Sequence, residues 1–187
     1  MDTRSQISNF PDSAADSAGL NSLPGISLTN LDCPEFSDKS RLSRIFAQLK
    51  AGQIRGWKDK DWGQPVEVDV SLEHADAQDY AALVLPGGVM NPDILRTKPE
   101  AVEFVRAFDR ASKPLAAICH GPWLLAESGA AKGRKVTSWP SLKTDLENAG
   151  AHWQDAEVVV DGHVITSRKP DDIPAFTQAI IDWLSKP

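Results

Sequence analysis

Apolar positions along the chain fall into short runs typical of strands and longer stretches with helical spacing. Strands are predicted at residues 53–57, over the alternating valines of 66–70, and at 79–85. Helices are predicted at 99–111 and 173–185, where apolar residues recur every three or four positions. Because strands and helices alternate, we expect an α/β fold built on a mostly parallel sheet with an added antiparallel hairpin.

A turn from a strand into a helix is predicted at Cys119. An apolar run ends at this cysteine, and the chain passes through His120, Gly121 and Pro122 into a new helix. Proline suits the first turn of a helix, so Cys119 should lie at a helix N-terminus, where backbone N–H groups and the helix dipole favour a thiolate. We therefore predict that Cys119 is a nucleophile and that His120 carries its proton.

The predicted strand at 79–85 runs into a second turn that contains Gly87 and Gly88. Carboxyl ends of parallel strands lie at the same edge of a sheet, so this turn and Cys119 can meet there. The backbone N–H groups of Gly88 and His120 are then the predicted donors to an oxyanion that develops when Cys119 attacks a substrate.

Two further elements are predicted in the C-terminal part of the chain. Asp161 and Gly162 stand between the apolar runs 157–160 and 163–167, which predicts an antiparallel hairpin. A helix is predicted at 141–150, with a serine cap at its start and a glycine at its end.

The first 48 residues differ in composition from the rest of the chain. They hold nine of the sixteen serines and none of the twelve valines or six tryptophans, so they are poorly suited to a central strand. We expect a disordered arm at 1–24 and a single α/β domain at 25–187, of which 25–48 is atypical. Within that atypical part, a short strand is predicted at 26–31 and a helix at 39–50.

Charge and composition narrow the class of function. The formal net charge of −6 at pH 7 argues against nucleic-acid and anionic-membrane partners, which bind clustered lysine and arginine. We predict a cytoplasmic protein, because the sequence has only two cysteines, Cys33 and Cys119, and its N-terminus has no signal-peptide pattern. His74, His152 and His163 have no metal-ligand spacing with the cysteines, and nucleotide-binding glycine motifs are absent, so we expect neither a metal nor a cofactor.

Two motifs carry a family resemblance, Leu-Val-Leu-Pro-Gly-Gly at 83–88 and Ala-Ile-Cys-His-Gly-Pro at 117–122. With them, the sequence resembles the ThiJ/PfpI family of the glutamine-amidotransferase-like superfamily, from about residue 49 to the end. Further matching stretches are 54–57, 61–63, 91–93, 137–141, 145–151 and 166–172.

The resemblance implies a flavodoxin-like three-layer sandwich in which Cys119 stands on a nucleophile elbow with His120 beside it. It also implies a homo-oligomer, a dimer or hexamer, in which Asp93 supplies an acid to the histidine of a neighbouring subunit. Relatives act as intracellular peptidases, as glyoxalase-like enzymes on methylglyoxal, or as deglycases, often in stress responses. The resemblance therefore implies a cysteine-dependent hydrolase acting on a small carbonyl compound or a peptide.

The sequence departs from this family at the first strand, whose terminal glutamate hydrogen-bonds to the cysteine in relatives. No glutamate precedes Glu35, and the expected position falls near Ile26. Real divergence and a reading-frame shift upstream of Leu49 are both open explanations.

A second function also stays open, a non-catalytic or redox-sensing stress protein in which Cys119 is oxidised reversibly. A glutamine amidotransferase is disfavoured, because His163 lacks the glutamate of a His-x-Glu pair.

Overall fold

The computed structural model describes residues 26–28, 45–48, 52–58 and 61–186. Its strands are β1 (Ile26–Leu28), β2 (Ile45–Gln48), β3 (Gly52–Lys58), β4 (Asp61–Val68), β5 (Val70–Ser71), β6 (Leu83–Leu85), β7 (Leu115–Ile118), β8 (Lys135–Val136), β9 (His152–Trp153), β10 (Val158–Asp161) and β11 (Val164–Ser167). Its α-helices are α2 (Met90–Leu95), α3 (Pro99–Arg110), α4 (Trp123–Ser128), α5 (Lys143–Asn148) and α6 (Ile173–Leu184). Short 3₁₀ helices are η3 (Leu72–His74), η4 (Ala77–Asp79), η5 (Pro140–Leu142) and η6 (Pro170–Asp172).

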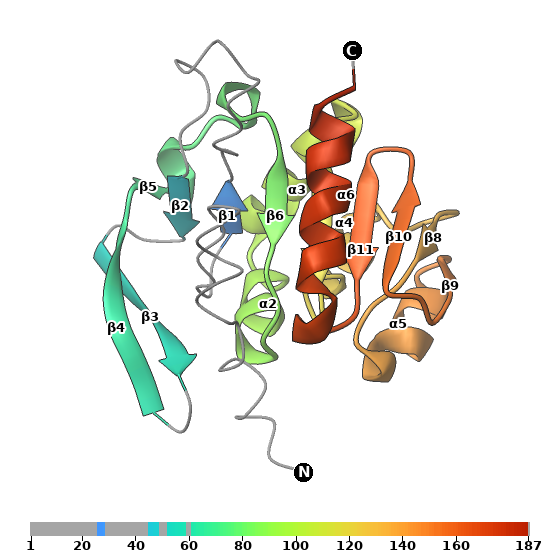
Figure 1. Cartoon of the computed structure of the whole chain (residues 1–187). Helices are drawn as coiled ribbons and strands as arrows, with labels where there is room; N and C mark the ends of the chain where they lie inside the picture. The colour runs from blue at the N-terminus through green and yellow to red at the C-terminus, as the bar shows by residue number, and fades with distance from the viewer. Residues whose placement is uncertain (1–25, 29–44, 49–51, 59–60, 187) are drawn as a thin grey trace.

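The main sheet has seven strands in the order β10-β11-β7-β6-β1-β2-β5 (Figure 1). At its centre, β6, β7 and β11 run parallel, and β10 closes one edge as the antiparallel partner of β11. β1 pairs with β6 in the antiparallel direction, through Ser27 and Val84. The pairs β3–β4 and β8–β9 form small separate sheets. A parallel centre with a hairpin at its edge is the arrangement that the sequence predicts.

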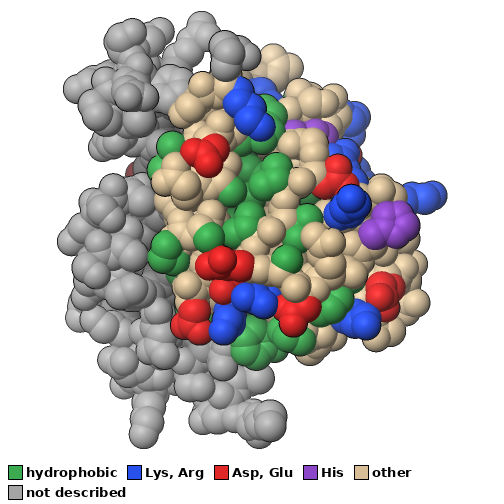
Figure 2. All heavy atoms as spheres, turned by 45° about the vertical axis from the view of Figure 1, so that its right-hand side comes forward, with side chains coloured by type: hydrophobic (Ala, Val, Ile, Leu, Met, Phe, Trp, Pro, Cys, Tyr) green, Lys and Arg blue, Asp and Glu red, His purple; other side chains and the backbone are tan. Residues whose placement is uncertain are grey.

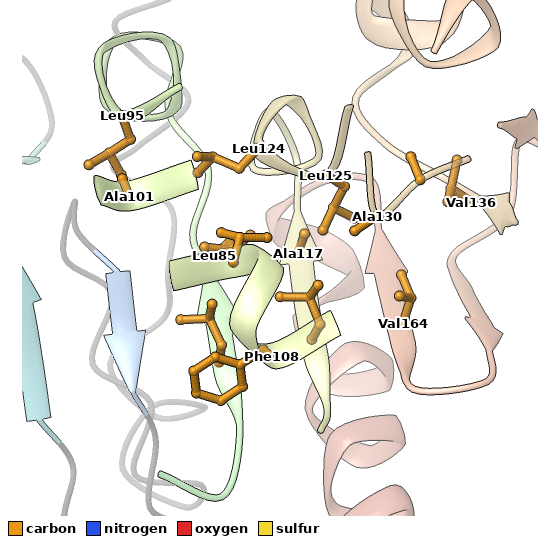
Figure 3. Packing of buried hydrophobic residues seen from close by; sticks show 14 of the residues in the cluster. Leu85, Leu95, Ala101, Phe108, Ala117, Leu124, Leu125, Ala130, Val136 and Val164 are labelled. Carbon is orange, nitrogen blue, oxygen red and sulfur yellow. The ribbon is translucent and has the colours of Figure 1, made fainter. Parts of the chain in front are cut away.

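The hydrophobic core lies in two layers, one on each face of the sheet. Successive side chains of a strand point to opposite faces, so Leu85 of β6 packs with Phe108 of α3 and Leu124 of α4 on one face (Figure 3). Val84 packs with Phe176 of α6 on the other face. Each fully buried leucine or phenylalanine contributes about 1.5–3 kcal/mol of transfer free energy. The result is the three-layer sandwich, with helices on both faces, that the family resemblance implies.

The helix predicted at 39–50 is wrong where the structure describes it. Residues Ile45–Gln48 form strand β2, which pairs antiparallel with β1, Ile26 opposite Ala47 and Leu28 opposite Ile45. Four residues are too few for an apolar pattern to distinguish a helix from a strand, and the ladder to β1 decides the outcome. The strand predicted at 26–31 is confirmed over Ile26–Leu28. The rest of these two predictions, at 29–31, 39–44 and 49–50, lies outside the described residues, as does the predicted arm at 1–24.

Other predicted elements are confirmed with shorter bounds. The strand predicted at 79–85 is only Leu83–Leu85, because 77–79 form η4. The helix predicted at 141–150 is split into η5 and α5. Its predicted serine cap is wrong, because Ser141 lies inside η5 and no side chain caps either helix. The hairpin around Asp161 and Gly162 forms as predicted, with Gly162 at a positive φ of 62°.

The surface of the described part mixes charges of both signs. Figure 2 shows basic and acidic side chains interspersed on the face that it draws. Glu103 of α3, for example, pairs with both Arg106 and Arg110 of the same helix. Among the helices that the structure describes, none has the length and apolar character needed to cross a membrane.

Candidate active site

Cys119 occupies a tight turn between β7 and α4. Its φ of +62° lies in the left-handed region, which a non-glycine residue enters only at a cost of about 1–3 kcal/mol. Hydrogen bonds hold the turn on both sides: the Cys119 N–H donates to Ser167 O at 3.1 Å, and Cys119 O accepts from the Trp139 N–H at 2.9 Å. The predicted elbow is therefore present, and neighbouring segments maintain its strained backbone.

Two glycines permit the elbow to lie against the end of β6. A Cβ placed on Gly87 would be 2.6 Å from Cys119 Cβ and 3.2 Å from its Sγ. A Cβ on Gly121 would collide with the carbonyl oxygen of Leu85. Since real Cβ atoms do not approach other atoms this closely, both positions require glycine. The glycine-rich turn after β6 and Cys119 do meet, as the sequence analysis expects.

The Cys119 thiol is buried, with 8% of the residue exposed. Its Sγ lies 3.2 Å from Nδ1 of His120 and accepts hydrogen bonds from the backbones of Gly88 and His120. Burial raises the pKa of Cys119 to about 11, outweighing these two hydrogen bonds, which act to lower it. This corrects the expectation of a thiolate at the elbow, because the desolvation of the charged sulfur is the larger effect.

His120 is equally buried, at 8% exposure, and lies between two tryptophans. The ring of Trp123 meets it edge-on at 5.1 Å between centroids, and the ring of Trp139 stacks at 6.2 Å. Its Nε2, on the far side of the ring from Cys119, lies 3.5 Å from Ser141 Oγ. Burial lowers the pKa of His120, so at neutral pH the ring is uncharged and able to accept a proton.

Asp93, the acid implied by the family resemblance, does not contact His120 within this chain. It lies on α2 with 53% of its side chain exposed, and its Oδ1 accepts from Nε and Nη2 of Arg96 at 3.1 and 2.9 Å. The Arg96 guanidinium in turn lies 4.7 Å from the ring centroid of Trp123. The role of Asp93 toward a neighbouring subunit stays a prediction.

The surroundings of Cys119 and His120 contain three side chains that the sequence did not predict there. Among the described residues, no carboxylate contacts Cys119 or His120, and no group of three His, Cys, Asp or Glu side chains could hold a metal ion. Trp123, Trp139 and Ser141 surround His120 although no periodicity singles them out. Trp139 and Ser141 lie in the stretch 137–141 that matches the family, which is the one sequence signal for them. They reach His120 through the folding of the chain, which a local pattern does not show.

Comparison with known proteins gives consistent matches. The model of the DJ-1/PfpI family matches residues 41–183. The chain is 42% identical over 138 residues to the deglycase PfpI of Pyrococcus furiosus, covering 74% of this chain and 80% of that protein. It is 45% identical over 130 residues to general stress protein 18 of Bacillus subtilis, covering 69% and 75% of the two chains.

Among solved structures, the chain resembles a two-domain protein of Anabaena variabilis that contains DJ-1/ThiJ/PfpI-like and ferritin-like domains. The TM-score is 0.70 at 35% identity, over 75% of this chain. The match spans only 39% of that longer protein. It confirms the flavodoxin-like fold class.

Proposed function

The chain belongs to the DJ-1/PfpI family, and on that premise we propose that it is a cysteine-dependent hydrolase that repairs or removes carbonyl adducts in stress protection. The observation that carries this proposal is the pair formed by Cys119 Sγ and His120 Nδ1, 3.2 Å apart beside the backbones of Gly88 and His120. This pair supports the proposal because the proposed nucleophile, proton acceptor and oxyanion donors all lie in the turn at Cys119 or in the neighbouring turn after β6.

The resting state of this pair is neutral. Burial raises the pKa of the Cys119 thiol and lowers that of the His120 imidazole, so both shifts oppose a preformed thiolate and imidazolium. The proton of the thiol must therefore move to Nδ1 as sulfur attacks, which makes His120 a general base in the first step. Such a step is suited to a polarised carbonyl carbon, because the developing charge passes to oxygen rather than staying on sulfur.

On a substrate whose carbonyl carbon carries the leaving amine, as in an amide or a peptide, the bonds change in a simple order. The carbon–sulfur bond forms while the thiol proton goes to His120 Nδ1 and the carbonyl π pair moves to oxygen. The backbone N–H groups of Gly88 and His120 stabilise the resulting oxyanion. The oxyanion then collapses, the bond to the leaving group breaks, and His120 returns the proton to that group. Water finally releases the acyl group from sulfur, and the thiol is restored.

Three activities fall within this proposal, and they differ in their substrates. A deglycase-type activity is favoured because the similar Pyrococcus furiosus protein is named a deglycase and the similar Bacillus subtilis protein a general stress protein. Peptide hydrolysis uses the steps above. Methylglyoxal, or an adduct whose amine has left to give the free aldehyde, is attacked in the same way, and the hemithioacetal then passes a proton from its carbon to the neighbouring carbon through an enediol. The S-lactoyl thioester so formed is hydrolysed by water, which restores the thiol.

We also propose that the protein acts as a homo-oligomer. Met90 and Ile94 of α2 are 67% and 46% exposed and flank the half-exposed Asp93. A second copy that covers this helix would bury both side chains and bring Asp93 to a neighbouring subunit. Light scattering on the purified protein tests this, because a monomer would contradict it.

A non-catalytic stress protein is the second candidate. The specific observation in its favour is that no carboxylate among the described residues contacts Cys119, whose raised pKa leaves it mostly protonated. The same raised pKa disfavours a redox sensor, because susceptibility to oxidation follows thiolate character.

The test compares the wild type with Cys119→Ser on three substrates: a methylglyoxal-modified amino acid, free methylglyoxal and a fluorogenic peptide. We expect the wild type to act on at least the first and Cys119→Ser to lose that activity by a factor of about 10² or more. Equal rates for the two proteins would remove Cys119 from the mechanism. No activity on any substrate would favour the non-catalytic candidate.

A further inference from the structure

The second nitrogen of His120 has a partner that the expected site does not include. Nδ1 faces Cys119 Sγ at 3.2 Å, and Nε2 faces Ser141 Oγ at 3.5 Å, so the two nitrogens contact different side chains on opposite sides of the ring. Among the described residues, Ser141 is the one hydrogen-bonding partner of Nε2. Because Asp93 pairs with Arg96 in this chain, Ser141 is the intrachain group available to orient the ring.

The chemistry of the imidazole makes this contact consequential. A neutral histidine carries one proton on one of its two nitrogens, and only the other nitrogen can accept a further proton. For His120 to take the thiol proton on Nδ1, its own proton must be on Nε2. A hydroxyl oxygen beside Nε2 accepts a hydrogen bond from the Nε2–H group in the neutral ring and again in the imidazolium formed after transfer.

The segment that carries Ser141 is fixed to the elbow. Trp139, two residues earlier, donates its N–H to Cys119 O at 2.9 Å and stacks its ring on His120. The Leu142 N–H donates to Trp139 O at 3.0 Å within η5, and the Leu142 side chain is fully buried. Ser141 itself is exposed, so its hydroxyl is held near Nε2 by the backbone while substitution there disturbs no core packing.

We propose that Ser141 is a positioning residue for His120, whose hydroxyl holds the proton on Nε2 and so keeps Nδ1 free to accept the proton of Cys119. This rests on the proposed function for its catalytic consequence, but the state of the ring can be measured without turnover. A serine at this place provides an orienting contact from the same chain, whatever a neighbouring subunit adds.

The test uses histidine-selective ¹⁵N labelling of the full chain, in which four histidines give few signals. His120→Asn assigns the His120 signals by their loss. The variants are Ser141→Ala, which removes the acceptor, Ser141→Thr, which keeps a hydroxyl, and Ser141→Asp, which adds a charge. Thr144, exposed on the neighbouring helix α5, provides matched controls as Thr144→Ala and Thr144→Asp.

We expect the wild type to hold the proton of neutral His120 on Nε2, and Ser141→Ala to shift the ¹⁵N signals toward a mixture of tautomers. Ser141→Thr should restore the wild-type signals. Ser141→Asp should raise the titration midpoint of His120 by about one unit or more, because an opposite charge nearby favours the imidazolium. Thr144→Asp should raise it much less, since Nε2 hydrogen-bonds to Ser141 and not to Thr144.

The rate on the best substrate should fall by about 2- to 12-fold in Ser141→Ala, the range that one hydrogen bond supports. Unchanged His120 signals in Ser141→Ala, or equal shifts in Ser141→Asp and Thr144→Asp, would overturn the positioning role. If the signals shift as expected while the wild type shows no activity, the positioning role stands and the proposed function fails.

Discussion

Replacing Gly87 with alanine probes the closest approach in the site. The added Cβ would lie 2.6 Å from Cys119 Cβ, whereas carbon atoms in contact prefer about 3.5–4.0 Å. The two backbones must therefore separate by about 1 Å, a form of overpacking that costs about 1–3 kcal/mol of folding free energy. The displacement also moves Gly88, the next residue, whose backbone hydrogen-bonds to Cys119 Sγ.

The expected kinetic effect follows from that displacement. Loss of one oxyanion donor lowers kcat by about 10²–10³-fold, so Gly87→Ala should lose activity in that range while it remains folded. The assay combines thermal melting with steady-state rates on the best substrate. A loss in kcat with little change in KM would indicate that the donor acts mainly in the transition state.

Gly129→Ala is the matched control for this variant. Gly129 has a φ of +84°, and no atom lies within 4 Å of a Cβ placed there. Alanine at this position therefore costs about 1–2 kcal/mol of backbone strain without contact to the elbow. Similar melting temperatures with very different kcat values support the reasoning. If Gly87→Ala turns over as fast as Gly129→Ala, the close approach of the two strand ends is not needed for catalysis.

Three further predictions concern the same elbow and its supports. The rate at which iodoacetamide alkylates Cys119, measured from the masses of the peptides, should rise about tenfold per pH unit, because the thiolate is the reactive form. The rate should level off only near the pKa of Cys119, about 11. A plateau near pH 8.5 would contradict the effect of burial on this pKa. His120→Asn should lower kcat by about 10²–10⁴-fold through loss of the general base, and near-normal rates would exclude it from proton transfer. Asp172→Asn should lower the unfolding free energy by about 1–3 kcal/mol, because buried Asp172 accepts two hydrogen bonds from Arg168; an unchanged denaturant midpoint would show that this pair contributes nothing.

The elbow was predictable because its signals are local. An apolar run that stops at Cys119 and passes through Gly121 and Pro122 leaves few conformations open, and Gly162 likewise marks the hairpin turn. Strand β2 was not predictable from Ile45 and Phe46, because two adjacent apolar residues suit a helix as well as a strand. Its identity depends on pairing with β1, which the local pattern does not encode.

The chemistry of the site was less predictable than its position. The sequence places Cys119 beside backbone N–H groups, which favour a thiolate, but the opposing effect of burial arises from segments far along the chain. Trp139 and Ser141 lie at His120 because the Trp139 N–H, just before η5, donates to the Cys119 carbonyl oxygen. Helix α2 was missed because its six residues are too few to show a helical apolar period.

The central claim is that Cys119 forms a covalent intermediate with a carbonyl substrate while His120 takes its proton. The most direct measurement is rapid-quench mass spectrometry of the full chain with a methylglyoxal-modified amino acid, followed by peptide mapping. We predict an adduct on the peptide that contains Cys119, formed and consumed at rates compatible with turnover and absent from Cys119→Ser. Turnover without such an adduct, or an adduct on another residue that is consumed at the turnover rate, would contradict the claim.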